Sequence, residues 1–238
     1  MRKLVISALA AMIAVSCSIK EERSGCPSWL SIRLSEKSLA IARSRTVLVT
    51  LRHAEGNDTL RLDSAEPGGW AKVGRGVAEM DGLLLNGAAL TVPWGGESDS
   101  LWTCSTRVPV LSDEETVTVE LHKRFATVDF IFESLPDTGG LLLVLRGDFH
   151  CLLAPSEKTA SVRLPAQRED TVLELECLAA SEGRKIWDWD LAGALRTAGY
   201  DWGAEDLADI RVRVSLAPLD LRVEIIPWEG GATLKLEI

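Results

Sequence analysis

The chain has 238 residues, a formal net charge of −9 and 46% hydrophobic residues. Its length allows one large domain or two of ordinary size, and its hydrophobic content is enough for a substantial core. The chain is acidic and has no basic cluster. This excludes a nucleic-acid binder, because such a protein neutralises phosphates with several cations on one face. It also excludes a basic patch for anionic lipid headgroups.

The first sixteen residues have the pattern of a bacterial lipoprotein leader. Arg2 and Lys3 precede an apolar stretch, residues 4–15, that is too short to span a bilayer. Small residues then precede Cys17, which predicts a signal peptide over residues 1–16 and lipidation of the Cys17 thiol. Two or three acyl chains hold a protein firmly on a membrane, since each buried methylene contributes about 0.8 kcal/mol. The alternative is an ordinary secretory signal with an incidental cysteine nearby.

A polar segment, residues 17–26, follows the predicted cleavage site and is interpreted as a lipidated tether. Removal of residues 1–16, which contain Arg2 and Lys3 and no acidic residue, takes the formal charge from −9 to −11. No later segment is long and apolar enough to predict a transmembrane helix.

Short runs that alternate apolar and polar residues follow the tether. This period of two is typical of antiparallel strands that turn one face inward, and clusters of Gly, Pro, Asn and Asp between the runs predict turns. In the first half we expect strands at 30–34, 47–52, 60–62, 83–85, 90–92 and 117–121, with turns at 56–58, 66–69, 95–99 and 112–114.

The second half continues in the same style, with a single helix. That helix is expected at residues 190–198, because Asp190 can cap it and Gly199 can end it. Strands are expected at 127–133, 141–146, 160–164, 171–177, 210–216, 219–226 and 233–238, with turns at 136–140 and 217–220. The number of expected strands is larger than one small sandwich contains. The predicted fold is all-β, with two antiparallel β-sandwich domains at residues 27–121 and 122–238 and one short helix in the second.

Four cysteines remain after Cys17, namely Cys26, Cys104, Cys151 and Cys177. An even number in an exported protein permits two disulfides, and the predicted domains would pair Cys26 with Cys104 and Cys151 with Cys177. The alternative is four buried thiols. The cysteines lack the spacing of a zinc site and the three histidines are scattered singly, so we predict no metal site and no cofactor.

The sequence contains no catalytic constellation that we can defend. It has no nucleophile elbow and no glycine-rich phosphate loop after a strand. Asp188 and Asp190 flank Trp189, but acidic residues at a helix N-terminus explain this pair. Eight tryptophans against four phenylalanines leave glycan binding as an alternative from another functional class. An exposed coplanar pair of tryptophans would favour a sugar site, and buried single tryptophans would favour a structural role.

Three motifs, in this order, resemble one known family. They are the segment from Cys17 to Leu30 with Cys26-Pro27 before the first strand, the segment His122-Lys-Arg-Phe-Ala-Thr-Val-Asp-Phe130, and a set made of Gly199-Tyr-Asp-Trp202, Glu205-Asp-Leu-Ala-Asp-Ile210 and Pro227-Trp228. The family is the anchor-subunit lipoproteins (FimB-like or minor-fimbria anchors) of the type V fimbriae of Bacteroidota. Gly25 stands where the family usually has Asp.

The resemblance implies two transthyretin-like sandwiches, no enzymatic activity, and a structural role that anchors a fimbria to the outer membrane. The implied partners are fimbrial stalk or accessory subunits and the outer membrane through acyl chains, with no nucleic acid and no small-molecule substrate. It also implies that Lys20, Glu21 and Glu22 direct export to the cell surface, although a solvated linker would also be charged. The functional alternative is a surface glycan-binding lipoprotein of a nutrient-uptake system.

The C-terminal residues 233–238 are a candidate donor strand for pairing with the neighbouring subunit. Leu234, Leu236 and Ile238 alternate with Lys235 and Glu237, so one face can fill a partner's groove while the other stays in water. We expect docking to use this end of the chain because the N-terminal segment is the tether. The alternative is that the segment completes the second sandwich.

Overall fold

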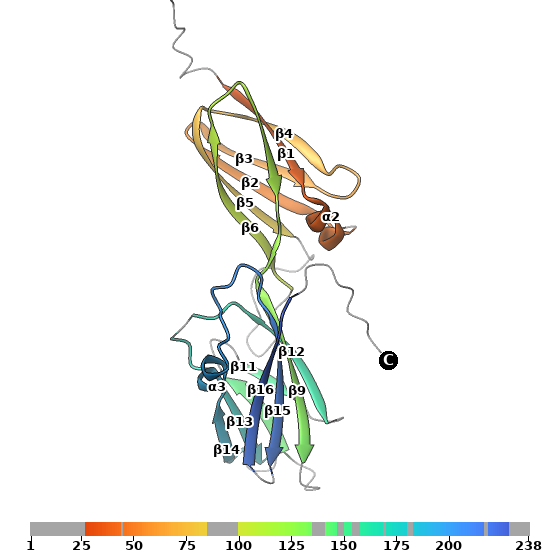
Figure 1. Ribbon diagram of the computed structural model, residues 1–238, viewed down its shortest axis with the longest axis vertical. Coiled ribbons are helices and arrows are strands. Elements are labelled where there is room, and N and C mark those ends of the chain that lie inside the picture. Colours follow the sequence, from red (N-terminus) through yellow and green to blue (C-terminus); the bar gives the residue numbers. More distant parts are fainter. Residues whose placement is uncertain are drawn as a thin grey trace, which may run out of the picture.

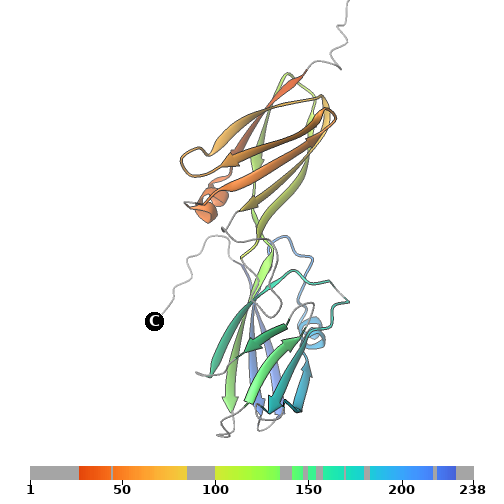
Figure 2. The same cartoon turned by 180° about the vertical axis from the view of Figure 1, so that it is seen from behind.

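The computed structural model describes residues 27–43, 45–84, 100–134, 141–146, 150–153, 158–168, 170–179, 183–216 and 219–228. Within them the chain forms two β-sandwiches stacked end to end, as predicted, and the two views in Figures 1 and 2 show the long axis of the rod. No helix of the described residues is long and apolar enough to cross a membrane.

The first sandwich contains two sheets with strand orders β4-β1-β7 and β3-β2-β5-β6-β8. Its strands are β1 (Ser28–Leu34), β2 (Val47–His53), β3 (Gly56–Leu62), β4 (Gly68–Val73), β5 (Gly76–Leu84), β6 (Trp102–Val110), β7 (Glu114–Val119) and β8 (His122–Lys123). The period of two decides which residues enter the core: Leu30, Ile32 and Leu34 of β1 are buried, whereas Trp29 and Arg33 face solvent.

The second sandwich has the strand orders β11-β10-β13-β14 and β12-β9-β15-β16. Its strands are β9 (Phe125–Ser134), β10 (Leu141–Arg146), β11 (His150–Leu153), β12 (Thr159–Pro165), β13 (Glu174–Ala179), β14 (Lys185–Asp190), β15 (Asp209–Leu216) and β16 (Leu219–Ile226). The first hydrophobic core runs from Leu30 to Phe125 and the second begins at Ala126. The domain boundary between residues 121 and 122 stays a prediction, because β8 still pairs with β6 of the first sandwich.

The sandwiches are not antiparallel throughout, which corrects one detail of the expectation. β1 runs parallel to β7, and β9 runs parallel to β15. Only strands joined by a hairpin are forced to be antiparallel, and β7 and β15 each enter their sheet from a strand of the opposite sheet. Alternation along one strand shows which face is buried but not which strand lies beside it.

The expected helix is present as α3 (Leu191–Thr197), and the Asp190 side chain accepts a hydrogen bond from the Gly193 N–H. A second helix, α2 (Glu36–Ala42), was not expected. Its N-cap Ser35 accepts from the Ser38 N–H, and seven residues are too few to show a clear helical period.

Five strands were missed, and some expectations cannot be compared. The missed strands are β4, β6, β11, β14 and the two-residue β8, and the turn expected at 56–58 lies earlier, because β3 already begins at Gly56. The expected strands at 90–92 and 233–238 and the turns at 95–99 and 136–140 lie outside the described residues.

Candidate functional site

Most residues of the predicted attachment and export sites lie outside the described part of the chain. These are Cys17, Lys20, Glu21, Glu22 and Cys26 at the start, and Leu234, Leu236 and Ile238 at the end. Lipidation, export and strand donation therefore stay predictions.

The cysteines of the second sandwich are not placed for a bridge. Cys177 on β13 is buried and free, and burial raises the pKa of its thiol. Cys151 lies on β11, and β10 separates these two strands, since Cys151 pairs with Leu145 and Cys177 pairs with Leu143. Two strand spacings put the Cα atoms about 9 Å apart or more, beyond the ~7 Å that a disulfide spans. The strand order therefore speaks against the Cys151–Cys177 pairing.

Cys104 in the first sandwich is likewise a buried free thiol, and burial raises its pKa. It lies near the end of β6 that pairs with β8. Cys26 lies outside the described residues, so its pairing with Cys104 stays a prediction.

The junction between the sandwiches is centred on Lys123, whose side chain is 2% exposed. Its ammonium group donates to Asp209 Oδ1 at 2.5 Å and to the Leu207 carbonyl at 3.2 Å. It also lies over the rings of Phe125 and Trp228, 4.9 and 5.3 Å from their centroids. Burial lowers the pKa of Lys123, and the hydrogen bond and charge of Asp209 oppose that shift. A buried cation with these partners holds β8 firmly to the segment before β15.

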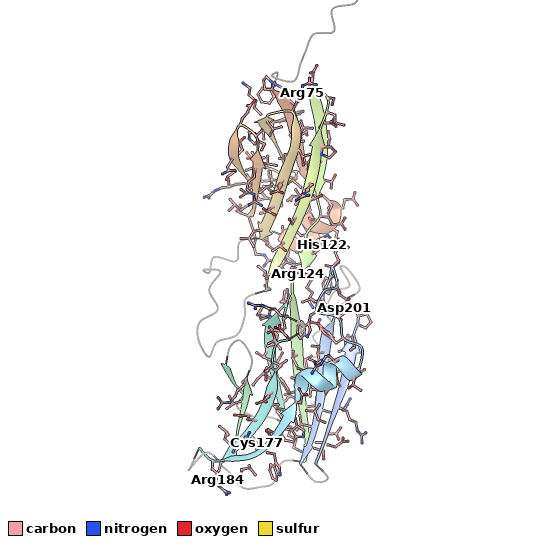
Figure 3. The ribbon with its side chains drawn as sticks, turned by 90° about the vertical axis from the view of Figure 1, so that its left-hand side faces the viewer. Arg75, His122, Arg124, Cys177, Arg184 and Asp201 are labelled. Carbon is pink, nitrogen blue, oxygen red and sulfur yellow. The ribbon has the colours of Figure 1, made fainter. Side chains whose placement is uncertain are left out.

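Asp206 extends this contact to the helix of the first sandwich. Its carboxylate accepts from the Lys123 backbone N–H at 2.7 Å and from the Lys37 ammonium on α2 at 3.0 Å. Burial opposes ionisation, but these hydrogen bonds and the Lys37 charge hold the pKa of Asp206 below its ordinary value. His122, on the other side of the chain from Lys123, contacts Asp206 and Glu205. Figure 3 labels His122 and Arg124 where the two sandwiches meet.

An aromatic cluster closes the junction. Trp228, which follows β16, packs against the first core, with its ring centroid 5.4 Å from that of Trp102. Trp102 also meets Phe125 edge to face at 5.7 Å. Through Trp228, the chain that leaves β16 returns to the junction and contributes to the core of the first sandwich.

The outer edge of β7 is open among the described residues. The Trp29 N–H donates to the Asp113 carbonyl and the Ser35 N–H donates to the Val119 carbonyl, so the odd-numbered residues of this segment bond to β1. The backbone groups of Glu114, Thr116 and Thr118 therefore point away from β1. No described strand pairs with this edge, which can accept a further strand.

The tryptophans are divided between core and surface. Of the seven that the structure describes, Trp102 is buried and four others are half-buried. Trp29 and Trp70 are 49% and 55% exposed. Both lie on the outer face of the β4-β1-β7 sheet, because Trp70 pairs with Ser31 and Trp29 pairs with Lys72.

A hollow of about 330 Å³ lies beside α3 in the second sandwich. Its lining combines the Trp202 indole with the guanidinium groups of Arg168 and Arg196 and the carboxylate of Asp201. These groups suit a sugar ring with hydroxyl or acidic substituents. Among the described residues, no group of three or more His, Cys, Asp and Glu side chains is placed to hold a metal ion.

The fold was then compared with known proteins. No protein-family profile and no curated protein matches this sequence. Among solved structures, the fimbrial anchor protein Mfa2 from Porphyromonas gingivalis superposes with a TM-score of 0.58 at 14% identity, over 85% of this chain and 98% of Mfa2. The chain shares its fold with a fimbrial anchor protein.

Two Bacteroides thetaiotaomicron proteins have the same fold. A candidate polysaccharide-binding protein matches with a TM-score of 0.56 at 12% identity, over 85% of this chain and 99% of that one. A candidate adhesin matches with a TM-score of 0.54 at 12% identity, over 84% of this chain and 96% of that one.

Sequence reasoning located the residues of the junction but missed their contacts. The motifs 122–130, 199–210 and 227–228 carried the family resemblance separately, and the structure brings them together around Lys123. Lys123 and Asp209 are 86 residues apart, so no local period could link them. The available signal was a lysine at an alternating position that should face the core.

Proposed function

We propose that this protein is a non-enzymatic structural lipoprotein that anchors a fimbria to the outer membrane at the cell surface. The observation that carries the proposal is the fold shared with Mfa2 across both sandwiches. It is supported by the lipoprotein pattern that ends at Cys17 and by the charged residues Lys20, Glu21 and Glu22. In this proposal the acyl chains hold the membrane side and the sandwiches hold a fimbrial subunit.

The junction suits a protein that must transmit force along its axis. A buried Lys123–Asp209 pair, the Asp206 contacts and the inserted Trp228 tie the sandwiches together at several points. Interfaces between domains of one chain are otherwise often mobile.

Strand addition is the proposed mode of contact with the next subunit. One site is the open edge of β7, where Thr116 and Thr118 offer their backbone groups and the Glu114 carbonyl accepts from the Ser112 hydroxyl. The other is the candidate donor segment with Leu234, Leu236 and Ile238. This segment follows Trp228 and thus starts from the junction rather than from the far end of the rod. Residues 229–238, of which the last six are the candidate donor segment, can reach about 35 Å when fully extended.

The Cys17→Ala variant tests membrane attachment. We expect both sandwiches to stay folded, because no described core residue belongs to the tether, and the protein to move to soluble fractions without labelled palmitate. Palmitate labelling and pelleting with outer membranes in the variant would contradict the proposal. A companion variant with Lys20, Glu21 and Glu22 changed to Ala should keep its lipid but lose accessibility to protease added outside the cell.

Deletion of residues 233–238 tests the donor strand. If these residues pair with a partner, the melting temperature should stay unchanged while fimbriae are shed into the medium. A large drop in melting temperature would show instead that they complete one of the sandwiches of this chain.

Glycan binding remains the second candidate function, and the hollow beside Trp202 favours it. Oligosaccharide binding that is lost in Trp202→Ala and kept in Trp187→Ala would support it. Trp187 is a matched control because, like Trp202, it packs against the second core, whereas only Trp202 lines the hollow.

A further inference from the structure

Exposed apolar side chains gather at the end of the first sandwich where the N-terminal segment enters. Of the five exposed large hydrophobic residues in the described part of the chain, Trp29, Val77 and Leu111 lie there, at 49%, 62% and 73% exposure. The Trp29 N–H donates to the Asp113 carbonyl, and Val77, the second residue of β5, pairs with Pro109, so all three residues lie at this end of the sandwich. Trp29 points out of the β4-β1-β7 sheet and Val77 points out of the opposite sheet. We call these three residues the apolar tip.

The apolar tip is held in place by Arg75. Its guanidinium donates to the Leu111 carbonyl at 2.9 Å and pairs with the Asp113 carboxylate. The loop that carries Leu111 is thereby fixed with the side chain turned outward. Figure 3 labels Arg75 at the end of the first sandwich opposite the junction. Leu111 is therefore exposed on a loop that Arg75 holds in place.

The length of the tether limits the distance between the apolar tip and the membrane. Only nine residues separate Cys17 from Pro27, directly before β1, and an extended chain of nine residues spans about 30 Å. The lipid on Cys17 thus keeps this end of the rod next to the bilayer. The exposed apolar residue of the second sandwich, Val172, lies beyond the junction.

We propose that the apolar tip is a membrane-contact surface that inserts into the boundary between lipid headgroups and acyl chains. This inference rests on the proposed lipid anchor at Cys17. Tryptophan prefers this boundary because its ring is apolar and its N–H is polar, and Val77 and Leu111 add aliphatic area at the same end of the sandwich. Apolar insertion also suits a mature chain with a formal charge of −11, which anionic headgroups would repel. The contact would hold the rod upright on its lipid.

Quenching of tryptophan fluorescence tests the proposal. The lipidated protein is reconstituted into phosphatidylethanolamine–phosphatidylglycerol vesicles whose acyl chains carry bromine. We expect quenching that falls at least about twofold in Trp29→Phe, and a similar fall in a Val77→Ser, Leu111→Ser double variant that keeps Trp29. Trp202→Phe and Val172→Ser, both beyond the junction in the second sandwich, are the controls and should leave the quenching unchanged.

The results separate the apolar tip from the anchor. Absent quenching, or quenching unaffected by Trp29→Phe, overturns the membrane contact. If quenching is absent and oligosaccharide binding needs both Trp29 and Trp70, the outer face of the β4-β1-β7 sheet binds a glycan instead. Mass spectrometry of the N-terminal peptide reports acylation independently. If Cys17 carries no lipid, flotation of the protein with the same vesicles tests the apolar tip alone: flotation lost in the double variant supports it, and no flotation overturns it.

Discussion

The two sandwiches repeat one strand order, but each has one strand without a counterpart, β8 in the first and β16 in the second. In each, the first strand lies between an antiparallel and a parallel neighbour, β4-β1-β7 in the first and β12-β9-β15 in the second. The opposite sheets also correspond, β3-β2-β5-β6 to β11-β10-β13-β14. The second sandwich adds β16 beside β15, and the first has no described strand in the equivalent position beside β7.

The added strand explains two properties of the rod. It covers the edge of β15, and it brings the chain back from the far end to the junction, where Trp228 enters the first core. The edge of β7 in the first sandwich is therefore open among the described residues, whereas β16 covers the equivalent edge of β15 in the second. The residues that follow β16 supply contacts that join the two sandwiches.

The largest expected effect on this arrangement comes from Lys123→Ala. The change removes the buried cation from Asp209, from the Leu207 carbonyl and from two aromatic rings, and should lower the free energy of unfolding by about 3 kcal/mol. Urea unfolding followed by tryptophan fluorescence measures it. Lys123→Met is the control, since it keeps the apolar stem and should lose less. Equal stability of Lys123→Ala and the parent would show that the sandwiches are not joined through this pair.

Asp206→Asn should have a smaller effect, which depends on pH. The variant loses the charged partner of Lys37 and keeps an acceptor for the Lys123 N–H, so about 1 kcal/mol should be lost at pH 7. The pKa of Asp206 is lowered from 3.8 in the folded protein. Its contribution is therefore complete above pH ~4 and disappears as the pH falls through the folded-state value. Parent and variant should converge in urea titrations as the pH falls below the ordinary carboxyl value of 3.8 and through the lower folded-state value. A difference that stays constant throughout the acid titration would contradict the assignment.

The smallest change in stability is expected for Thr116→Pro. The Thr116 N–H points away from β1, and proline is tolerated on edge strands where the N–H faces outward, so unfolding should change by less than about 0.5 kcal/mol. If β7 receives a partner strand, the variant should remain folded but lose its fimbriae, and electron microscopy of cells would show their absence. Val117→Pro, which breaks a bond to β1, is the destabilising control. Normal fimbriae on Thr116→Pro cells would exclude the β7 edge.

Sequence patterns predicted the features that depend on residues close together in the chain, such as the buried face of a strand and the ends of a helix. Alternation in Leu30, Ile32 and Leu34 showed the inward face of β1, and Asp190 with Gly199 marked the ends of α3. The parallel partner of β1 could not be predicted, because β7 lies more than 80 residues later. The junction was missed for the same reason: an isolated lysine at position 123 looks like a surface residue until Asp209 and Trp228 surround it.

The central claim is that the lipid at Cys17 ties a fimbria to the cell through this protein. The direct measurement is the amount of fimbriae retained on cells compared with that shed into the medium when Cys17→Ala replaces the parent. The account predicts normal fimbrial assembly with the fimbriae and the variant released together. Fimbriae retained on the cells at the parental level, with the variant soluble and folded, would contradict it.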